Sequence, residues 1–308
     1  MNGICVLGSL NMDLVIRAPR LPAPGETLLG GPFGTFLGGK GANQAVAAAR
    51  LQSEEAPPVT LAGRVGDDAH GEELRQGLLR EGLDLQYLRS IQGQVTGVAL
   101  ITVDDAGENS IVVASGANAS FLPDDLPVGV IRQAGLIVCQ LELPLPTVER
   151  AAVLANAAGV PIVLNAAPAC PLPLSLLARL DLLVVNRSEA ALLAGCGESE
   201  PAEELAAYLL ATGAKAVVVT LGRDGALLSN GGRTIRQDAF AVNSIDAVAA
   251  GDAFVGALAV AWLERKPDPD ALRFACAAGA LATTRAGAIP SLPTRGEVRT
   301  LAPNGLTG

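Results

Sequence analysis

The sequence predicts an α/β protein: one domain over residues 1–308, with a mostly parallel central sheet flanked by helices and a small projecting β-sheet. Short apolar runs alternate along the chain with longer runs rich in alanine and leucine, which is typical of strand–helix–strand crossovers. Half of the residues are hydrophobic but only 3% are aromatic, so the core must be built mainly from Ala, Leu and Val. The length allows one large α/β domain or one domain with a small appendage.

The central sheet is expected from apolar runs that read as strands buried on both faces. They are Ile4–Leu7, Val59–Leu61, Leu136–Gln140, Ile162–Leu164, Leu182–Val185 and Ala216–Thr220. Helices are expected between and after them, at Ala42–Leu51, Glu72–Glu81, Pro146–Ala157, Ser188–Ala194, Ala202–Ala211 and Val255–Leu263. Alternation of this kind favours right-handed crossovers and a parallel sheet covered by helices.

The small sheet, which we interpret as a lid, is expected from extended segments near residues 12–34 and 95–115. Leu14–Ile16 is predicted to pair with Glu26–Leu29. Gly97–Val103 and Ser110–Val113 read as a hairpin turned at Asp104–Asn109.

Composition argues against several classes of protein. The formal net charge is -9, from 22 Lys+Arg and 31 Asp+Glu, which is unsuited to a nucleic-acid or anionic-membrane surface. The five scattered cysteines and the single histidine, His70, form no CxxC or Cys/His cluster, so neither structural zinc nor a disulfide framework is indicated. No signal-like start and no apolar run of about 20 residues is present, so we expect a cytoplasmic protein.

A glycine cluster at Gly38–Ala45, GGKGANQA, leads into an alanine-rich helix. Clustered glycines let the backbone approach a ligand closely, and Lys40 and Asn43 bring polar groups to the helix start. Gly34–Lys40 also fits GxxxxGK, but Gly41 stands where a P-loop has the Ser or Thr that holds magnesium. We therefore exclude a P-loop. A glycine-rich turn before a core helix is the purely structural alternative.

A second motif runs from Asp246 to Phe254, DAVAAGDAF, before the apolar helix. Small residues before a helix expose its first N–H groups, which can form an anion site. Asp252 beside such a site could accept a proton from an alcohol while the N–H groups stabilise a transferring phosphoryl group. An aspartate that merely caps the helix is the alternative.

Polar residues also follow several predicted strands, where ligands of an open parallel sheet gather. Asn11 and Asp13 follow the first strand and Glu142 follows Leu136–Gln140, and amides with carboxylates suit a polyol. Asn186–Glu189 and Thr220–Ala226 stand at strand ends where a nucleotide could lie. Solvated turns and helix caps are the alternatives.

Together these motifs resemble the phosphofructokinase-B (pfkB) family of carbohydrate kinases. GGKGANQA at Gly38–Ala45 and AAGDAF at Ala249–Phe254 are similar to its two signatures, the first in the form found in kinases of free ribose. GSLNMD, PGET, GRVGDD, GENSIVV, GANA, QLELP, NRSEA, TLGRDGA and TRAGAIPS follow in family order between about Gly3 and about Val298. The chain departs from the second signature at Ala247, where the family usually has Thr.

The resemblance implies a role for each matching position. Sugar hydroxyls would be held by Asn11, Asp13, Gly39, Lys40, Asn43, Glu142 and Asp252. Asp252 would be the general base, and the N–H groups of Ala249, Ala250 and Gly251 would form an anion hole. The nucleotide would lie against Asn186, Glu189, Thr220, Gly222, Gly225, Gly251 and Cys276, with Asn186 and Glu189 organising phosphate, Mg²⁺ and water. An activating monovalent cation, K⁺, would be held by Asp246, Val248, Ala282, Arg285, Gly287 and Ser291.

The activity implied by the resemblance is ATP-dependent phosphorylation of D-ribose at its 5-hydroxyl, by a homodimer paired through the lid. The same chemistry on deoxyribose, another small sugar or a nucleoside is the nearest alternative, and a non-catalytic sugar- or nucleotide-binding regulator is a second. A Rossmann dehydrogenase is excluded, because only Gly8 and no GxGxxG follows the first strand.

Overall fold

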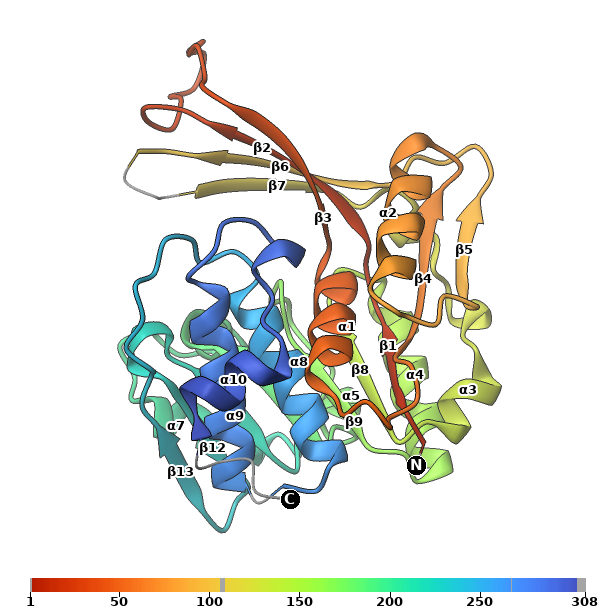
Figure 1. Cartoon of the computed structure of the whole chain (residues 1–308). Coiled ribbons are helices and arrows are strands. Elements are labelled where there is room, and N and C mark those ends of the chain that lie inside the picture. The colour runs from red at the N-terminus through yellow and green to blue at the C-terminus, as the bar shows by residue number, and fades with distance from the viewer. Residues whose placement is uncertain (1, 106–108, 267, 304–308) are drawn as a thin grey trace.

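The computed structural model describes residues 2–105, 109–266 and 268–303. Within them a large sheet has the strand order β13-β12-β11-β10-β9-β8-β1-β4-β5 (Figure 1). Its strands are β1 (Ile4–Leu7), β4 (Thr60–Gly66), β5 (Leu88–Ile91), β8 (Leu136–Gln140), β9 (Ile162–Asn165), β10 (Leu182–Asn186), β11 (Val217–Thr220), β12 (Ala226–Ser229) and β13 (Thr234–Gln237). The strands from β5 to β11 pair in parallel, and β12 and β13 add an antiparallel edge. The predicted α/β fold with a mostly parallel sheet is confirmed.

The order of the strands fixes where a ligand can bind. From β1 the chain passes to β4 and β5 on one side, and then returns to β8 on the other side of β1. The carboxyl ends of β1 and β8 therefore border the crevice at which the winding of the sheet reverses. Open α/β sheets bind their ligands in such a crevice.

Helices cover both faces of the sheet. They are α1 (Lys40–Leu51), α2 (Ala69–Arg80), α3 (Val128–Gln133), α4 (Leu145–Ala158), α5 (Leu174–Leu177), α6 (Arg187–Ala194), α7 (Ala202–Ala211), α8 (Ala250–Leu263), α9 (Asp268–Ala282) and α10 (Arg295–Leu301). Alternate residues of β1 join different cores: Ile4 and Val6 pack with α1, α8 and α9, whereas Cys5 and Leu7 pack with α4 and α7. Successive residues of a strand point to opposite faces of the sheet, and both faces are covered by helices. The strands are therefore apolar at nearly every position. In the part of the chain that the structure describes, no helix is long and apolar enough to cross a membrane.

A second sheet projects from the body in the order β3-β2-β6-β7 (Figure 1). Its strands are β2 (Asn11–Arg17), β3 (Phe33–Gly38), β6 (Gly97–Val103) and β7 (Asn109–Ala114). β6 and β7 pair in antiparallel fashion, as predicted, although residues 106–108 of their turn lie outside the described residues.

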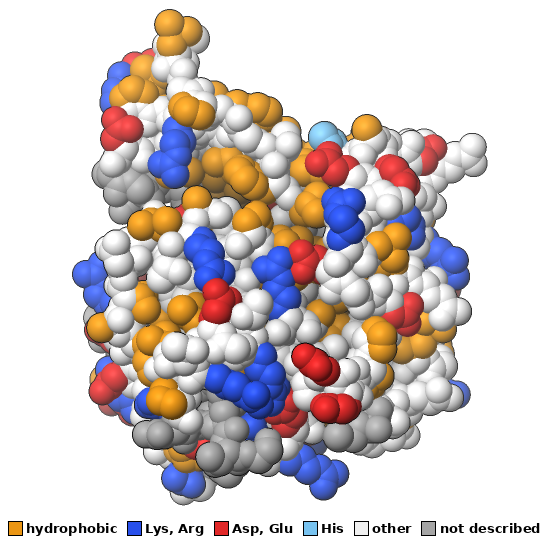
Figure 2. Space-filling model, viewed as in Figure 1, with side chains coloured by type: hydrophobic (Ala, Val, Ile, Leu, Met, Phe, Trp, Pro, Cys, Tyr) orange, Lys and Arg blue, Asp and Glu red, His pale blue; other side chains and the backbone are white. Residues whose placement is uncertain are grey.

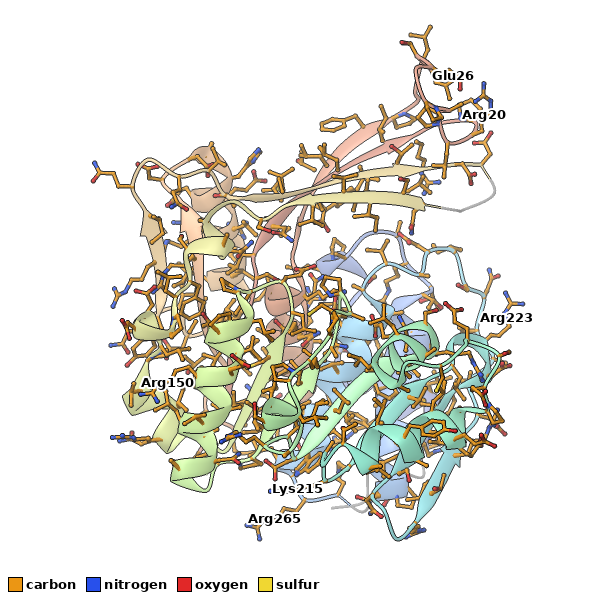
Figure 3. All side chains as sticks on the ribbon, turned by 180° about the vertical axis from the view of Figure 1, so that it is seen from behind. Arg20, Glu26, Arg150, Lys215, Arg223 and Arg265 are labelled. Atoms are coloured by element: carbon orange, nitrogen blue, oxygen red, sulfur yellow. The ribbon has the colours of Figure 1, made fainter. Side chains whose placement is uncertain are left out.

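One predicted strand of the small sheet is wrong. The partner of β2 is β3, not Glu26–Leu29. Glu26 is held in the loop between β2 and β3, where its carboxylate accepts a hydrogen bond from the N–H of Ala23 at 3.0 Å and pairs with Arg20. Figure 3 shows Arg20 and Glu26 together at the tip of the small sheet. Extended pairing resumes after Pro32, which has no N–H to donate.

The geometry of β3 also confirms that the GxxxxGK match is not a P-loop. Gly34–Gly38 lies in a strand whose residues pair with β2, so its N–H groups do not cradle a phosphate.

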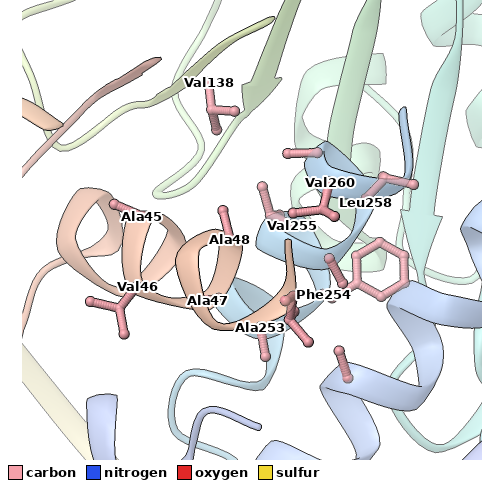
Figure 4. Packing of buried hydrophobic residues seen from close by; sticks show 14 of the residues in the cluster. Ala45, Val46, Ala47, Ala48, Val138, Ala253, Phe254, Val255, Leu258 and Val260 are labelled. Carbon is pink, nitrogen blue, oxygen red and sulfur yellow. The ribbon is translucent and has the colours of Figure 1, made fainter. Parts of the chain in front are cut away.

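Small residues line the contact between α1 and α8 (Figure 4). Ala45, Ala47 and Ala48 of α1 pack with Ala253 and Val255 of α8. A Cβ atom on Gly256 would lie 2.5 Å from the Cβ of Ala47, so a larger residue there would force the helices apart. The alanine-rich core thereby places the first turns of two helices side by side.

Candidate active site

The site begins where β1 ends and α1 begins. A Cβ atom on Gly41 would lie 2.4 Å from the carbonyl carbon of Gly8, so glycine at both positions lets the helix start meet the strand end. Gly39 precedes α1 with a φ of 90°, a left-handed conformation that glycine adopts without strain. These contacts hold Lys40 and Asn43 at the crevice beside β1 and β8.

Glu142, just after β8, joins three segments at this crevice. Its Oε2 accepts hydrogen bonds from the hydroxyl of Ser9 at 2.5 Å and from the backbone N–H of Lys40 at 3.2 Å. The side-chain amide of Asn11 donates to the same oxygen at 3.4 Å. The structure thus brings together Asn11, Lys40 and Glu142, three residues that sequence analysis placed in a sugar site.

The orientation of Asn11 is fixed by Asn118, which follows β7. The Nδ2 of Asn118 donates to the Oδ1 of Asn11 at 2.9 Å and to the carbonyl of Leu10 at 3.0 Å. Its Oδ1 accepts from the N–H of Leu10 at 3.0 Å. Because its oxygen is taken, Asn11 presents its NH₂ group to Glu142 and the crevice.

Asp13 and Lys40 carry the charges of this half of the site. Burial, together with the charges of Glu142 and Asp252, raises the pKa of Asp13 to about 7, while Lys40 opposes this shift. Burial alone would lower the pKa of Lys40, but Asp252, Glu142, Glu189 and Asp13 outweigh it, so that its pKa is raised. Lys40 is therefore a cation balanced by carboxylates from several elements.

Asp252 lies in the first turn of α8 and is 7% exposed. Its Oδ2 accepts from the amide of Asn43 and its Oδ1 from the amide of Gln44, both at 2.9 Å. Burial raises the pKa of Asp252, against the charge of Lys40 and the two amide donors. Ala249, not Asp252, is the N-cap of α8, so the alternative of a helix-capping aspartate is wrong.

The turn before α8 leaves donors near Asp252. Ala249 has a φ of 58° and a ψ of 7°, a left-handed conformation that costs a residue with a Cβ about 1 kcal/mol. The N–H of Ala250, one of the three donors expected in the anion hole, already donates to the carbonyl of Ala247 at 3.3 Å. A Cβ on Gly251 would meet nothing within 4 Å, so this backbone is open to a ligand. Since first-turn N–H groups have no partner inside a helix, an anion can bind there.

A cavity of about 210 Å³ adjoins Asp252 and continues the site towards β10 and β11. In-register pairing places Asn186 beside Thr220 at the carboxyl ends of these strands. Asn186 and Glu189 cap α6 reciprocally, each side chain accepting from the other's N–H at 2.8 Å. Burial raises the pKa of Glu189, against the backbone bond from Asn186 and the charge of Lys40. Predicted residues that line the cavity are Lys40, Asn186, Glu189, Thr220, Ala249, Gly251 and Asp252.

Three residues expected at the nucleotide do not line this cavity. Gly222 and Gly225 lie in the turn between β11 and β12. Cys276 is buried in α9, and burial raises the pKa of its thiol to about 12, so it is a packed, un-ionised side chain.

The segments expected to hold a monovalent cation also meet. The carboxylate of Asp246 accepts from the N–H of Val248 at 3.0 Å and from the N–H of Gly287 at 2.8 Å. Ser291 is fully buried, and Arg285 pairs with Glu297 instead of pointing at Asp246. Asp246 thus ties the turn before α8 to the loop after α9.

Comparison with known proteins shows the family to which the chain belongs. Residues 1–295 match the sequence profile described as pfkB family carbohydrate kinase. The chain belongs to the pfkB carbohydrate kinase family. This pfkB kinase is 40% identical to a ribokinase of Schizosaccharomyces pombe, over 97% of each chain.

Two solved structures resemble the pfkB kinase over almost their whole length. A ribokinase from Thermotoga maritima superimposes with a TM-score of 0.90 at 32% identity, covering 99% of this chain and all of the other. A ribokinase from Arabidopsis thaliana, solved with ribose and ATP, gives a TM-score of 0.88 at 36% identity, covering 97% of this chain and 98% of the other.

Sequence reasoning assigned no role to several residues that the structure places in or beside the site. They are Ser9, Gln44, Asn118, Gln140 and Asn165. Each is a polar residue in an apolar stretch, and the first four lie inside motifs that carried the family resemblance. Polarity at a buried strand end or helix start was the signal that could have found them.

Proposed function

We propose that this kinase transfers the γ-phosphoryl group of ATP to the 5-hydroxyl of D-ribose, with Asp252 as general base. The observation that carries the proposal is the position of Asp252. It is a buried carboxylate at the start of α8, between the cluster around Glu142 and the cavity lined by Asn186, Glu189 and Thr220. A sugar in the first region and a triphosphate in the second would meet at this carboxylate.

The chemistry follows from the groups around Asp252. Its carboxylate would take the proton as the 5-oxygen forms a bond to phosphorus and the bond to the ADP oxygen breaks. Phosphoryl transfer has a loose transition state, so holding the hydroxyl in line matters more than base strength. Lys40 and the open backbone at Gly251 would stabilise charge on the transferring group.

The protein has oxygen atoms that could coordinate Mg²⁺ near the cavity and K⁺ near Asp246. Glu189 faces the cavity with a carboxylate and Asn186 with an amide, so these two residues would hold Mg²⁺, which would neutralise phosphate charge. Asp246 and the carbonyl groups of the two segments that it joins would hold K⁺.

A bare pentose suits the sugar half of the site because its polar groups are both donors and acceptors. Carboxylates of Asp13 and Glu142 accept from hydroxyls, while the amides of Asn11 and Asn43 and the ammonium of Lys40 donate to them. A nucleoside would need an apolar or aromatic wall for its base.

The test is ATP-dependent ADP release with ribose, 2-deoxyribose, fructose, adenosine and 5-deoxyribose, with and without K⁺. We expect ribose to be preferred, 5-deoxyribose to be inert because it lacks the attacked hydroxyl, and K⁺ to stimulate turnover. Preference for adenosine would overturn the sugar assignment, and no ADP release with any acceptor would favour a regulator. Indifference to K⁺ would overturn the cation site.

We also propose that the small sheet closes over the sugar as a lid and pairs two copies of the chain. Leu100 of β6 and Val112 of β7 lie directly opposite each other in register and are 54% and 65% exposed. Figure 2 shows hydrophobic side chains gathered over the projecting sheet. A partner sheet would remove this apolar surface from water.

A further inference from the structure

We propose that Gln44 positions Asp252 for catalysis, by holding its carboxylate through a buried chain of side-chain amides formed by Gln140, Gln44 and Asn165. This inference rests on the proposed function and names a residue that acts on the substrate only through Asp252. We call these three residues the amide chain.

The hydrogen bonds of Gln44 leave its amide one orientation. Its Nε2 donates to the Oδ1 of Asp252 at 2.9 Å and to the Oδ1 of Asn165 at 3.0 Å. Its Oε1 accepts from the Nε2 of Gln140 at 2.7 Å. If the amide were reversed, its oxygen would face two acceptor oxygens and its nitrogen would face a donor. Both hydrogens and the oxygen are therefore committed.

The amide chain is anchored to the central sheet. Gln140 and Asn165 are neighbours in register at the carboxyl ends of β8 and β9. The Nδ2 of Asn165 donates to the carbonyl of Val184 in β10 at 3.2 Å. Gln140 and Gln44 are 0% and 1% exposed, so water does not compete for these bonds. The position of Asp252 is thus set by three strands through one side chain of α1.

Gln44 differs from its neighbour Asn43, which the resemblance assigns to the sugar. Asn43 donates to the other carboxylate oxygen of Asp252, but its own Oδ1 is buried with no partner among the described residues. That oxygen is available to a sugar hydroxyl. Gln44 has no such free atom: its nitrogen and oxygen are hydrogen-bonded and its side chain is 1% exposed, so its amide is not available to a substrate.

Without Gln44 the carboxylate would keep only the bond from Asn43 and could rotate about it. Displacement of a reacting group by about 1 Å can cost on the order of 100-fold in rate. Removing a donor also favours the protonated acid. The charged groups that face Asp252 are Lys40 of α1, Glu142 after β8 and Asp13 of β2, and all three remain in a Gln44 variant.

The experiment compares Gln44→Leu, Gln140→Leu and the control Gln52→Leu in steady-state kinetics with ribose and ATP. Leucine preserves volume but removes the amide, and Gln52 lies at the other end of α1, away from the site. We expect kcat of Gln44→Leu to fall by about 10- to 100-fold with both KM values within about threefold of wild type. The acidic limb of its kcat–pH profile should move to higher pH. Gln140→Leu should show a smaller loss of the same kind. In that variant Gln44 still donates to Asp252, but its amide has lost the hydrogen bond from Gln140 that orients it.

Thermal unfolding and calorimetric ribose binding separate positioning from structure. If Gln44→Leu binds ribose normally but keeps a kcat within twofold of Gln52→Leu, the inference is wrong. It is equally wrong if kcat and ribose affinity fall together with the unfolding temperature. Should Gln44→Leu not fold, Gln140→Leu is judged by the same criteria. Absence of phosphorylation by the wild-type enzyme would instead contradict the proposed function.

Discussion

Asn118 donates a hydrogen bond to the Oδ1 of Asn11 across 2.9 Å, and so connects the end of the small sheet to the part of the site that we propose binds the sugar. The two residues are separated by 107 positions in sequence, and both are almost fully buried. A Cβ atom on Gly97, at the start of β6, would lie 2.2 Å from that same oxygen of Asn11. The start of β2, the start of β6 and the segment that follows β7 therefore meet at the side-chain amide of Asn11.

Replacing Asn118 by Ala should weaken ribose binding, because the amide of Asn11 would lose the partner that orients it. We expect the KM for ribose to rise by about tenfold while the KM for ATP stays within about twofold, since a lost bond to a buried group costs about 1–3 kcal/mol. Steady-state kinetics measure both values, with Ser120→Ala as the neighbouring control. An unchanged ribose KM would show that Asn118 does not orient Asn11.

Asp13→Asn should stabilise the ligand-free protein at alkaline pH. With a folded pKa of about 7, above the ordinary value of 3.8, Asp13 keeps its proton in the folded state where the unfolded chain loses it. Its contribution to the free energy of unfolding therefore falls as pH rises from about 4 to about 7 and stays low above that. At pH 8 the variant should be more stable by about 1–4 kcal/mol, since one pKa unit corresponds to about 1.4 kcal/mol.

Denaturant unfolding at pH 4 and pH 8 checks the Asp13 prediction, with the exposed Asp124→Asn as control. The two variants should behave alike at pH 4 and differ at pH 8. A loss of stability in Asp13→Asn at pH 8 would contradict the crowding of carboxylates around this residue. The same variant should bind ribose more weakly. Asp13 would then lower the stability of the free protein while strengthening its binding of ribose.

The fold was predictable where its signals are local. Runs such as Leu182–Asn186 are apolar at nearly every position, so they identify strands buried on both faces. The edge strands β12 and β13 were not predicted. In β13 only Ile235 is apolar, and exposed and half-buried positions alternate, so this strand gives no buried apolar run, and β12 lies between it and the turn at Gly222–Asp224. Glu26–Leu29 was misassigned because its turn depends on contacts of Glu26 that no propensity encodes.

The sequence predicts the residues that we propose to face the ligands, but it does not predict the residues that hold them in place. Asn11, Lys40 and Asp252 stand out because glycines and strand ends surround them. The bonds of Gln44 to Gln140 and Asp252 span 96 and 208 positions. These bonds form only when α1, α8 and β8 pack together, so no local pattern in the sequence predicts them.

Val112→Glu should separate the proposed dimer into monomers. A charge on this exposed apolar position would have to be buried without a partner when two small sheets pair. Sedimentation velocity should show a dimer for the wild type and for Leu174→Glu, an equally exposed position on α5 of the body, and a monomer for Val112→Glu. A wild-type protein that is monomeric at micromolar concentration would contradict pairing through the small sheet.

The role of Asp252 is tested most directly by measuring kcat for ribose phosphorylation and the calorimetric Kd for ribose in wild type and Asp252→Asn. Loss of a general base should reduce kcat by about 100- to 10,000-fold, while Kd stays within about threefold because Asn11, Lys40 and Glu142 still hold the sugar. A variant that binds ribose normally and retains a kcat within about threefold of wild type would show that Asp252 does not take the proton.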